Sequence, residues 1–304
     1  MKQRAIDLAI AKRRAEIVAK KEEISKRASL VLAFSDVKKA HDNYVSWAFK
    51  NARGGFDDEE KLAKQGYIDA LKKHGYSEDD LHYAPSCPIC GDTLSVGGKV
   101  CACVRAAYVA ALKNICEIEA RAPFTFDDAN FDAIKDDAQR ENLKKFFDYF
   151  KLYASKLPAV KAKTTVLFGG VGTGKTCIAS AVSRAVIERG KSVKFVSAYE
   201  FNTAMLTAHT SPTSERSGMI KDYLAADLLV IDDLGTEPIL KNVTEPYLLL
   251  VLEERQNRGL CTLVTCNLSP ERILERYGER IYSRLANKQS SRIFELGGRD
   301  LRLN

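Results

Sequence analysis

The chain has 304 residues, of which 45% are hydrophobic and 29% are charged, and its 47 basic and 40 acidic residues give a formal net charge of +7. These values are typical of a globular protein of about two domains, and they exclude collagen-like, wholly disordered and disulfide-rich mini-protein classes. No run approaches the ~18 apolar residues of a membrane span, and residues 1–20 lack the apolar core of a secretory signal. We therefore expect a cytoplasmic protein with no membrane association. Residues 1–27 hold nine basic and four acidic residues, a bias compatible with nucleic-acid binding.

Residues 1–80 are predicted to be helical, because they are rich in Ala, Lys, Glu, Arg and Leu and contain no proline. Gly54, Gly55 and Gly75 are expected to divide them into about three helices. Apolar side chains recur at every seventh position, namely Ile10, Ile17, Ile24 and Val31. The companion positions of a coiled coil are basic, so this is a single apolar stripe. It fits a helix that packs on its own domain or one that docks on a partner protein.

Four of the eight cysteines lie within seventeen residues: Cys87, Cys90, Cys101 and Cys103. Without a secretory signal, this clustering favours a metal site over disulfides. Four thiolates complete a closed tetrahedral Zn²⁺ site, which is structural rather than catalytic. The Cys-x-Cys pair is shorter than the commonest spacing, so His82 or Cys116 could replace one ligand. Buried free thiols and a redox pair remain as alternatives.

Residues 104–155 are again predicted to be helical, with an interruption at 122–128. Short apolar runs separated by helical stretches then follow. The predicted strands are 164–168, 193–197, 228–232, 261–266 and 293–296. Strands that alternate with helices predict a parallel sheet covered on both faces. We expect a helical, zinc-stapled domain at 1–110, a linker at 111–125 and an α/β domain at 126–304.

A phosphate-binding loop is predicted directly after the first of these strands. Residues 169–176 read G-G-V-G-T-G-K-T and precede a helix, which is the strand–loop–helix context that this motif requires. The glycines let successive N–H groups form an anion cradle, and the helix N-terminus adds partial positive charge. Lys175 is placed for the β- and γ-phosphates and the Thr176 hydroxyl for Mg²⁺. The predicted nucleotide-binding residues are Gly170, Val171, Gly172, Thr173, Gly174, Lys175, Thr176 and Cys177.

Two carboxylates end the predicted strand at 228–232, which reads L-L-V-I-D and is followed by a second Asp. Beside a phosphate loop, Asp232 is expected to hold Mg²⁺ with Thr176, and Asp233 to orient the attacking water as general base. An ordinary strand-to-loop pair of acids is the alternative. Asn267 follows the next strand, and a neutral polar side chain there suits a hydrogen bond to the attacking water or the γ-phosphate.

Basic residues recur every four positions near the C-terminal end: Arg272, Arg276, Arg280, Arg284, Lys288 and Arg292. On one helix they would form a basic stripe. The stripe could be a solvated face paired with Glu271, Glu275 and Glu279. One or two of the arginines could instead reach the nucleotide of a neighbouring subunit.

Four segments together carry a resemblance to a known family: 169–176, 228–235, 265–267 and 278–285. In order and spacing they are similar to the AAA+ ATPases of the DnaC/DnaI helicase-loader group, and the IstB transposition helpers share them. The resemblance spans residues 120–304. It implies an α/β AAA+ P-loop fold with a five-stranded parallel sheet, and an ATPase that uses ATP and Mg²⁺.

The resemblance also implies roles for single residues. Asn267 looks like sensor 1, and Arg284 looks like the arginine finger, with Arg280 as second candidate. Arg302 resembles the sensor-2-like arginine and would bind the nucleotide. Asp233 stands where Glu is commoner in AAA+ proteins, so hydrolysis is expected to be slow and switch-like.

The implied function is that of a helicase loader, in which residues 1–110 bind a hexameric replicative helicase. The ATPase domain would self-associate and deliver that helicase to single-stranded DNA during replication initiation. DnaI-type loaders also have a zinc-bearing N-terminal domain, which favours a loader over a transposase helper. A zinc-bearing P-loop nucleotide kinase and a binding module with a silent ATPase are the further alternatives.

The segment 199–226 mixes basic and aromatic residues, and in the resembled family this region faces single-stranded DNA. Such side chains can bind phosphates and stack on bases. We therefore expect Phe201, Arg216 and Lys221 to bind DNA. A solvated pair of helices is the alternative.

Overall fold

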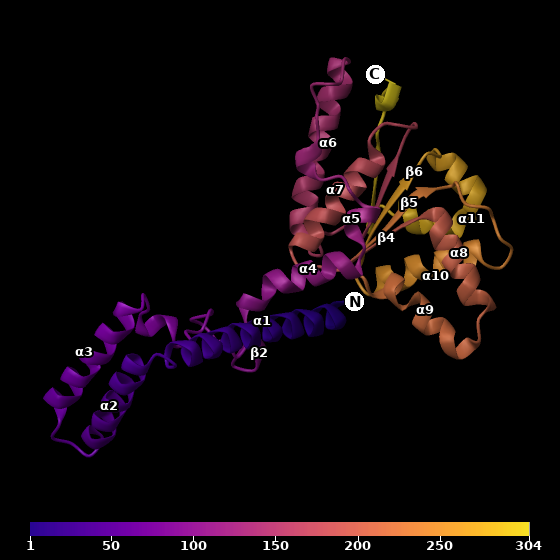
Figure 1. The fold of residues 1–304 in the computed structure, drawn as a ribbon. Coiled ribbons are helices and arrows are strands. Elements are labelled where there is room, and N and C mark those ends of the chain that lie inside the picture. The colour runs from indigo at the N-terminus through magenta and orange to yellow at the C-terminus, as the bar shows by residue number, and fades with distance from the viewer. Residues whose placement is uncertain (304) are drawn as a thin grey trace. The chain divides into compact units, whose positions relative to one another are not determined.

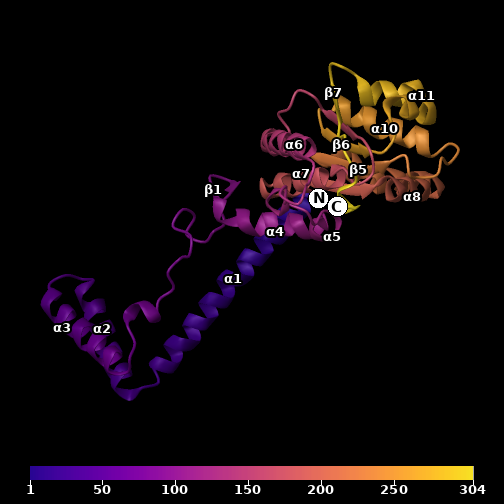
Figure 2. The same cartoon turned by 90° about the horizontal axis from the view of Figure 1, so that it is seen from above.

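The computed structural model describes residues 1–303, which divide into two compact units (Figures 1 and 2). One unit holds residues 9–107, and the other holds residues 1–8 together with the chain from 108 onward. Within the described residues, no helix is both long and apolar enough to cross a membrane.

Three helices open the chain: α1 (Lys2–Val31), α2 (Ser35–Asn51) and α3 (Asp57–Lys73). The predicted number is confirmed, and Gly54 and Gly55 connect α2 to α3 with φ of 87° and 96°. The break between α1 and α2 contains neither glycine nor proline and was not predicted. The seven-residue stripe of α1 lies on its buried side, since Ile17 and Val31 are buried. This burial favours packing within the chain.

The cysteine segment of this unit contains little regular structure. Its elements are η1 (Glu78–Asp80), β1 (Ser95–Val96), β2 (Lys99–Val100) and η2 (Ala102–Val104). Strands β1 and β2 form a short antiparallel hairpin that turns at Gly97 and Gly98, both with positive φ. The hairpin returns the chain so that Cys101 follows it directly.

The other unit is built on a five-stranded sheet of order β4-β5-β6-β3-β7. Every neighbouring pair is parallel, which confirms the predicted class. The strands are β3 (Thr164–Phe168), β4 (Val193–Ser197), β5 (Leu228–Leu234), β6 (Cys261–Cys266) and β7 (Ser291–Glu295). β5 runs two residues further than predicted and has an irregular register between Ile231 and Leu234.

Helices cover both faces of this sheet, with α6 and α7 on one face and α8, α10 and α11 on the other (Figure 1). The helices are α4 (Arg105–Ile115), α5 (Ile118–Arg121), η3 (Phe126–Asp128), α6 (Asp137–Lys156), α7 (Lys175–Glu188), α8 (Ala198–Thr210), α9 (Thr213–Ala225), α10 (Thr244–Asn257), α11 (Pro270–Ala286) and η4 (Leu301–Leu303). Residues 111–125, where a linker was expected, contribute to the core: Leu112, Ile118 and Ala122 are completely buried there. Burial of these apolar side chains makes the segment part of the unit.

The basic residues at 272–292 do not lie on one continuous helix, so the single basic stripe considered from the sequence does not form. Gly278 interrupts α11 with φ 76° and ψ 170°, and the helix ends at Ala286. Lys288 and Arg292 therefore lie beyond the helix, in the following turn and in β7. A four-residue repeat predicts one face only while the backbone stays helical.

Candidate functional site

The phosphate-loop motif has the conformation that it requires. It links β3 to α7, which begins at Lys175. Gly172 and Gly174 have φ of 71° and 99°, a region that favours glycine. A Cβ on Gly169 would lie 2.1 Å from the Leu296 carbonyl oxygen. The loop lines a cavity of about 190 Å³. The residues around it are Val171, Gly172, Thr173, Gly174, Lys175, Thr176, Cys177, Asp233, Asn267, Leu301 and Arg302.

Lys175 is held inside this loop. Its side chain is buried, and Nζ donates to the carbonyl oxygens of Gly169 and Gly170 at 3.0 and 2.6 Å. Burial lowers the pKa of Lys175, while the neighbouring carboxylates of Asp233 and Asp232 oppose that effect. The ammonium is therefore already oriented towards the loop in which phosphates would bind.

Asp232 is paired with the hydroxyl expected to share its metal. The Thr176 hydroxyl donates to both carboxylate oxygens at 3.1 Å. Burial raises the pKa of Asp232, and its hydrogen bond from Thr265 opposes that effect. A buried carboxylate beside a threonine hydroxyl at a phosphate loop is the donor set that Mg²⁺ uses in P-loop NTPases.

Thr265 is a site residue to which the sequence analysis gave no role. Its hydroxyl donates to Asp232 Oδ1 at 2.6 Å and accepts from the backbone N–H of Asp233 at 2.8 Å. One side chain on β6 thus positions both acids on β5. Thr265 lies two residues before Asn267, on a strand expected to end at the same edge of the sheet. This position in the sequence could have indicated that its side chain belongs to the site.

Asp233 adopts an unusual backbone conformation, with φ of 56°. This left-handed conformation costs a residue with a side chain about 1–3 kcal/mol, and such strain concentrates at functional sites. The Asn267 amide lies 3.4 Å from Asp233 Oδ1, at the long end of the hydrogen-bond range. Both side chains line the cavity, so the structure brings the two together.

The chain after β7 returns to the phosphate loop and brings Arg302 to the cavity. The Leu301 N–H donates to the Gly172 carbonyl at 3.0 Å. Two residues before Leu301, the Arg299 carbonyl accepts from the Gln139 side-chain amide at 2.8 Å, and the Arg299 N–H donates to the amide oxygen of Gln139 at 3.1 Å. These bonds hold the tail beside the loop, and Arg302 lines the same cavity as Lys175.

An apolar cavity of about 310 Å³ adjoins the phosphate loop. It shares Gly174, Cys177 and Leu301 with the polar cavity. Its other walls are mainly aromatic and aliphatic, and include Phe124, Phe131, Ile134, Leu143 and Phe147. A polar cradle beside an apolar pocket suits a ligand with a charged end and a planar apolar end.

Among the described residues, neither Arg284 nor Arg280 lines the phosphate-loop cavity. Arg284 Nη2 lies 2.8 Å from Glu253 Oε1, and the Gln256 side chain donates to its carbonyl oxygen. Arg280 is exposed and lines a separate cleft of about 550 Å³, with Glu253 on another of its walls. Neither guanidinium is therefore placed beside its own phosphate loop.

The expected DNA-binding residues have different environments. Phe201 is only 4% exposed and packs edge-to-face on Tyr223, with ring centroids 5.6 Å apart. It is part of the core and cannot stack on a base, so this prediction is wrong. Arg216 is half-buried, with Nε donating to the Ser211 carbonyl at 3.0 Å, and Lys221 is exposed.

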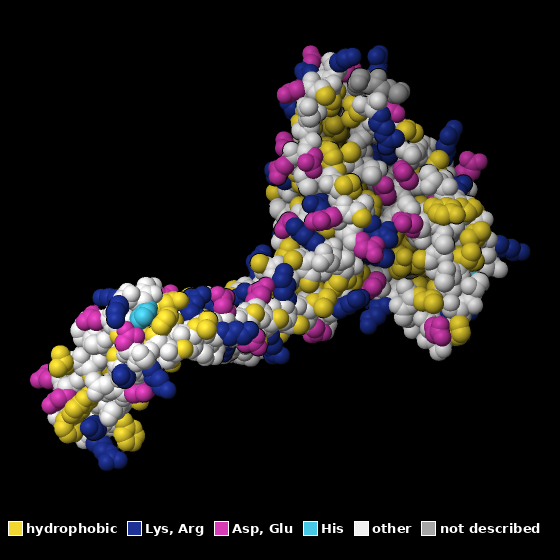
Figure 3. Space-filling model, in the orientation of Figure 1, with side chains coloured by type: hydrophobic (Ala, Val, Ile, Leu, Met, Phe, Trp, Pro, Cys, Tyr) yellow, Lys and Arg dark blue, Asp and Glu magenta, His cyan; other side chains and the backbone are white. Residues whose placement is uncertain are grey.

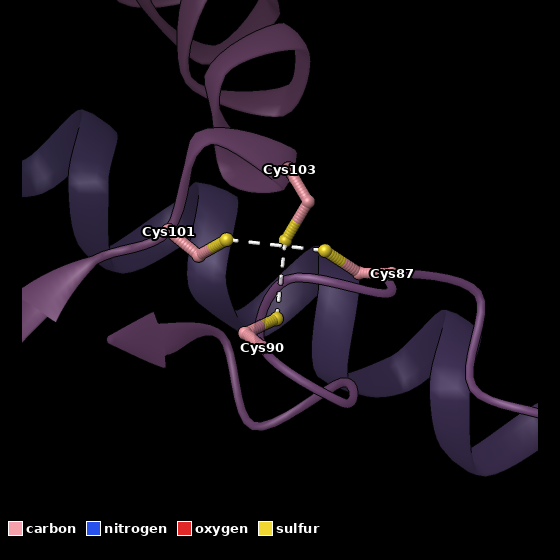
Figure 4. Close-up of side chains that lie close together, drawn as sticks. All are labelled: Cys87, Cys90, Cys101 and Cys103. Carbon is pink, nitrogen blue, oxygen red and sulfur yellow. Dashed lines mark hydrogen bonds between the residues drawn. The ribbon is translucent and has the colours of Figure 1, made fainter.

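The four clustered cysteines converge on one point (Figure 4). All four sulfur atoms lie within 4.8 Å of one another. Cys87 and Cys101 are 3.9 Å apart, and Cys90 and Cys103 are 3.7 Å apart. Tetrahedral zinc with Zn–S bonds of about 2.3 Å separates its sulfurs by about 3.8 Å. The donor set fits zinc, while Cys116 is buried in the core of the other unit.

Comparisons of the sequence with known proteins find one matching family and several similar relatives. Residues 153–283 match the family described as IstB-like ATP binding protein. The replicative helicase loader DnaC of Escherichia coli K12 is 30% identical over 121 residues, which are 40% of this chain and 49% of that protein. The replicative helicase loader DnaI of Bacillus subtilis 168 is 27% identical over 144 residues, which are 47% and 44% of the two chains. The chain spans about half the length of the curated relatives it matches.

Two solved structures of helicase loaders are also similar to this chain. A crystal structure of DnaI is 20% identical, with a TM-score of 0.45 over 60% of this chain and 93% of that one. A crystal structure of the DnaC helicase loader is 19% identical, with a TM-score of 0.45 over 56% and 98%.

The sheet and the phosphate-loop site define an α/β fold with a P-loop, and residues 153–283 are similar to IstB-like ATP binding proteins. The predicted resemblance to the DnaC/DnaI group of helicase loaders is confirmed, since two curated relatives carry those names.

Proposed function

We propose that this chain is an ATP-dependent helicase loader that binds a hexameric replicative helicase and delivers it to single-stranded DNA. The observation that carries the proposal is one cavity lined by Lys175, Thr176 and the tail residue Arg302, with Asp232 hydrogen-bonded to Thr176. The two curated relatives described above are named replicative helicase loaders. A slow, switch-like ATPase would time release of the helicase.

Each site residue has a defined task in ATP hydrolysis. Loop N–H groups and Lys175 bind the phosphates, and Arg302 adds a second positive charge from the tail. Mg²⁺, held by Thr176 and Asp232, would neutralise charge on the phosphate oxygens. Asp233 accepts the proton of the attacking water, which Asn267 helps to orient. The apolar cavity beside Gly174 takes the nucleobase.

The position of Arg284 supports self-association through the ATPase domain. An arginine that completes phosphoryl transfer must reach the γ-phosphate, and neither Arg284 nor Arg280 lines its own cavity in the described chain. Either would therefore act on the nucleotide of a neighbouring subunit.

The N-terminal unit is the proposed helicase-binding part. Its α2–α3 hairpin exposes apolar side chains, with Phe49 67% and Leu62 76% exposed. Figure 3 shows apolar and basic side chains together over this hairpin. Exposed apolar groups of this size are typical of surfaces that bind other proteins.

The function can be tested by affinity purification of the full chain from its native cell. We expect the replicative helicase to co-purify, and to do so more strongly with ATP than without it. Co-purification of a transposase in its place would support the helper ATPase, and phosphate transfer to a nucleoside or nucleotide would support a kinase.

We expect the purified protein to bind about one Zn²⁺ per chain through the four clustered cysteines. Cys90→Ser should lose the metal and unfold residues 9–107, because four thiolates complete this site. Metal analysis and circular dichroism measure both effects. Cys116→Ser is the matched control and should keep the metal, whereas full occupancy in a variant lacking all four clustered cysteines would contradict the assignment.

We expect Arg216 and Lys221 to contact the phosphates of single-stranded DNA. Replacing both by alanine should weaken single-stranded DNA binding and reduce the slope of log K against log salt by about 1.4, because each phosphate contact contributes about 0.7. Fluorescence anisotropy with a labelled oligonucleotide measures this. Lys145→Ala with Lys151→Ala, on exposed positions of α6, removes the same charge. Equal slopes for the two double variants would place the DNA elsewhere.

A further inference from the structure

Glu237 is a buried carboxylate that the proposed mechanism leaves unused. It lies three residues after β5 and is 2% exposed. Its Oε2 accepts from the Gly235 N–H at 2.9 Å, and its Oε1 accepts from the Tyr277 hydroxyl. In residues 1–303 no basic side chain forms an ion pair with this carboxylate. A buried carboxylate is costly unless it is hydrogen-bonded, so these two bonds hold it in place.

One end of this contact is tied to the nucleotide site. The Asp233 carbonyl accepts from the N–H and the hydroxyl of Thr236 at 3.2 and 2.9 Å. Gly235 follows with φ of 108°, and a Cβ there would lie 2.6 Å from Leu268 Cδ1. The segment from Asp233 to Glu237 is therefore closely restrained, and displacement of Asp233 would displace Glu237.

The other end is Tyr277, the last residue before the break in α11. Tyr277 is 2% exposed, and Gly278 follows it with non-helical φ and ψ. Burial and the Glu237 carboxylate both raise the pKa of Tyr277, so the phenol keeps its proton and remains a donor. Beyond the break, the second half of α11 carries Arg280 and Arg284.

We infer that Glu237 and Tyr277 form a latch that joins the loop after Asp233 to α11 at its break and fixes the direction of residues 279–286. Both are positioning residues, because neither lines the phosphate-loop cavity. The latch gives the nucleotide site of one subunit a physical connection to the arginines that it would offer to the next. This inference rests on the proposed function, in which an arginine of α11 acts on a neighbour's nucleotide.

Tyr277→Phe tests the latch because it removes only the hydroxyl, and the Gly235–Glu237 bond remains. We expect unchanged ATP binding and about tenfold slower hydrolysis in the assembled protein, the size of effect of losing a hydrogen bond to a charged group. Hydrogen exchange should rise in residues 279–286 and stay unchanged in residues 169–176. Tyr247→Phe is the matched control, since the Tyr247 hydroxyl makes no hydrogen bond with residues 1–303.

Mixing experiments with the full chain distinguish a positioning role from a general loss of structure. A Tyr277→Phe subunit keeps its nucleotide pocket but presents its arginines poorly. Mixed with Lys175→Ala, it should regain activity, because the partner supplies well-placed arginines. Mixed with Arg284→Ala, it should regain none. The opposite pattern would mean that the hydroxyl acts on its own pocket, and would overturn the latch.

A second variant keeps the inference testable if Tyr277→Phe does not fold. Glu237→Ala removes both acceptor oxygens, so it should behave like Tyr277→Phe with an additional loss, because the Gly235 N–H loses its partner as well. If exchange in residues 279–286 equals that of Tyr247→Phe, the latch is wrong. If Arg284→Ala and Lys175→Ala do not complement each other, the proposed arginine in trans is wrong, and the exchange measurement still decides on the latch.

Discussion

Replacing Asp233 by asparagine is expected to lower the rate of ATP hydrolysis by about 10²–10⁴-fold, the range for loss of a general base, and to leave ATP binding close to that of the unchanged protein. Asparagine has nearly the same shape, so the turn at this position and the N–H bond to Thr265 should persist. Its amide cannot accept the proton of the attacking water. The loss should therefore appear in the chemical step.

Single-turnover hydrolysis and equilibrium binding of a fluorescent ATP analogue separate the two effects. Asp148→Asn, at an exposed position on α6, is the matched control and should change neither. Asp232→Asn should weaken Mg²⁺-dependent binding as well, because Asp232 shares its proposed metal with Thr176. Hydrolysis by Asp233→Asn within threefold of the control would remove Asp233 from the role of base.

The α/β part of the fold could be predicted closely from the sequence. The predicted strands at 164–168, 193–197 and 261–266 have the observed bounds, because buried parallel strands are continuous apolar runs. β5 continues through Asp232 and Asp233, where the apolar run has already ended. β7 begins two residues earlier than predicted, since it is an edge strand whose first residues are polar.

The helical period of residues 198–208 indicates which side chains of that segment are buried. In α8 the buried side chains recur at helical spacing: Ala198, Phe201, Asn202, Met205 and Ala208. This period places Phe201 on the core side. The mixture of basic and aromatic residues in 199–226 concealed that pattern, because composition does not show which face a side chain occupies.

The remaining features of the site depend on contacts between distant segments. Thr265 acts on two acids more than thirty residues away, and Gln139 holds the backbone of Arg299 across 160 residues. No local period or motif encodes such pairs. The motif residues were therefore predictable individually, whereas the side chains that position them became evident only in the folded chain.

Arg284→Ala is expected to have the largest effect of any change outside the phosphate-loop cavity. An arginine supplied in trans contributes roughly 10³–10⁵ in the rate of phosphoryl transfer. Arg284 forms an ion pair with Glu253, and the two side chains are 43% and 33% exposed. A pair this exposed contributes about 0–1 kcal/mol, so the guanidinium can leave Glu253 for a neighbour's phosphate at little cost.

If this assignment holds, isolated subunits should bind ATP yet hydrolyse it slowly, and turnover per subunit should rise with protein concentration or with helicase. Arg284→Ala should abolish that rise and spare ATP binding. Arg292→Ala, which removes the same charge from β7, is the control and should retain the rise. Arg280→Ala tests the second candidate, and only one of the two α11 variants should lose the stimulation completely.

Mixing Arg284→Ala with Lys175→Ala decides whether the arginine acts between subunits. One variant keeps a working pocket and the other keeps a working arginine, so a mixed assembly contains complete sites at their junctions. Activity should therefore return and reach its maximum near equal amounts. A planar, permanently charged guanidinium holds two phosphate oxygens at once, so Arg284→Lys tested by itself should recover little of the activity that Arg284→Ala loses. Absence of recovery at every ratio, despite proven co-assembly, would place Arg284 in its own subunit's site or outside catalysis.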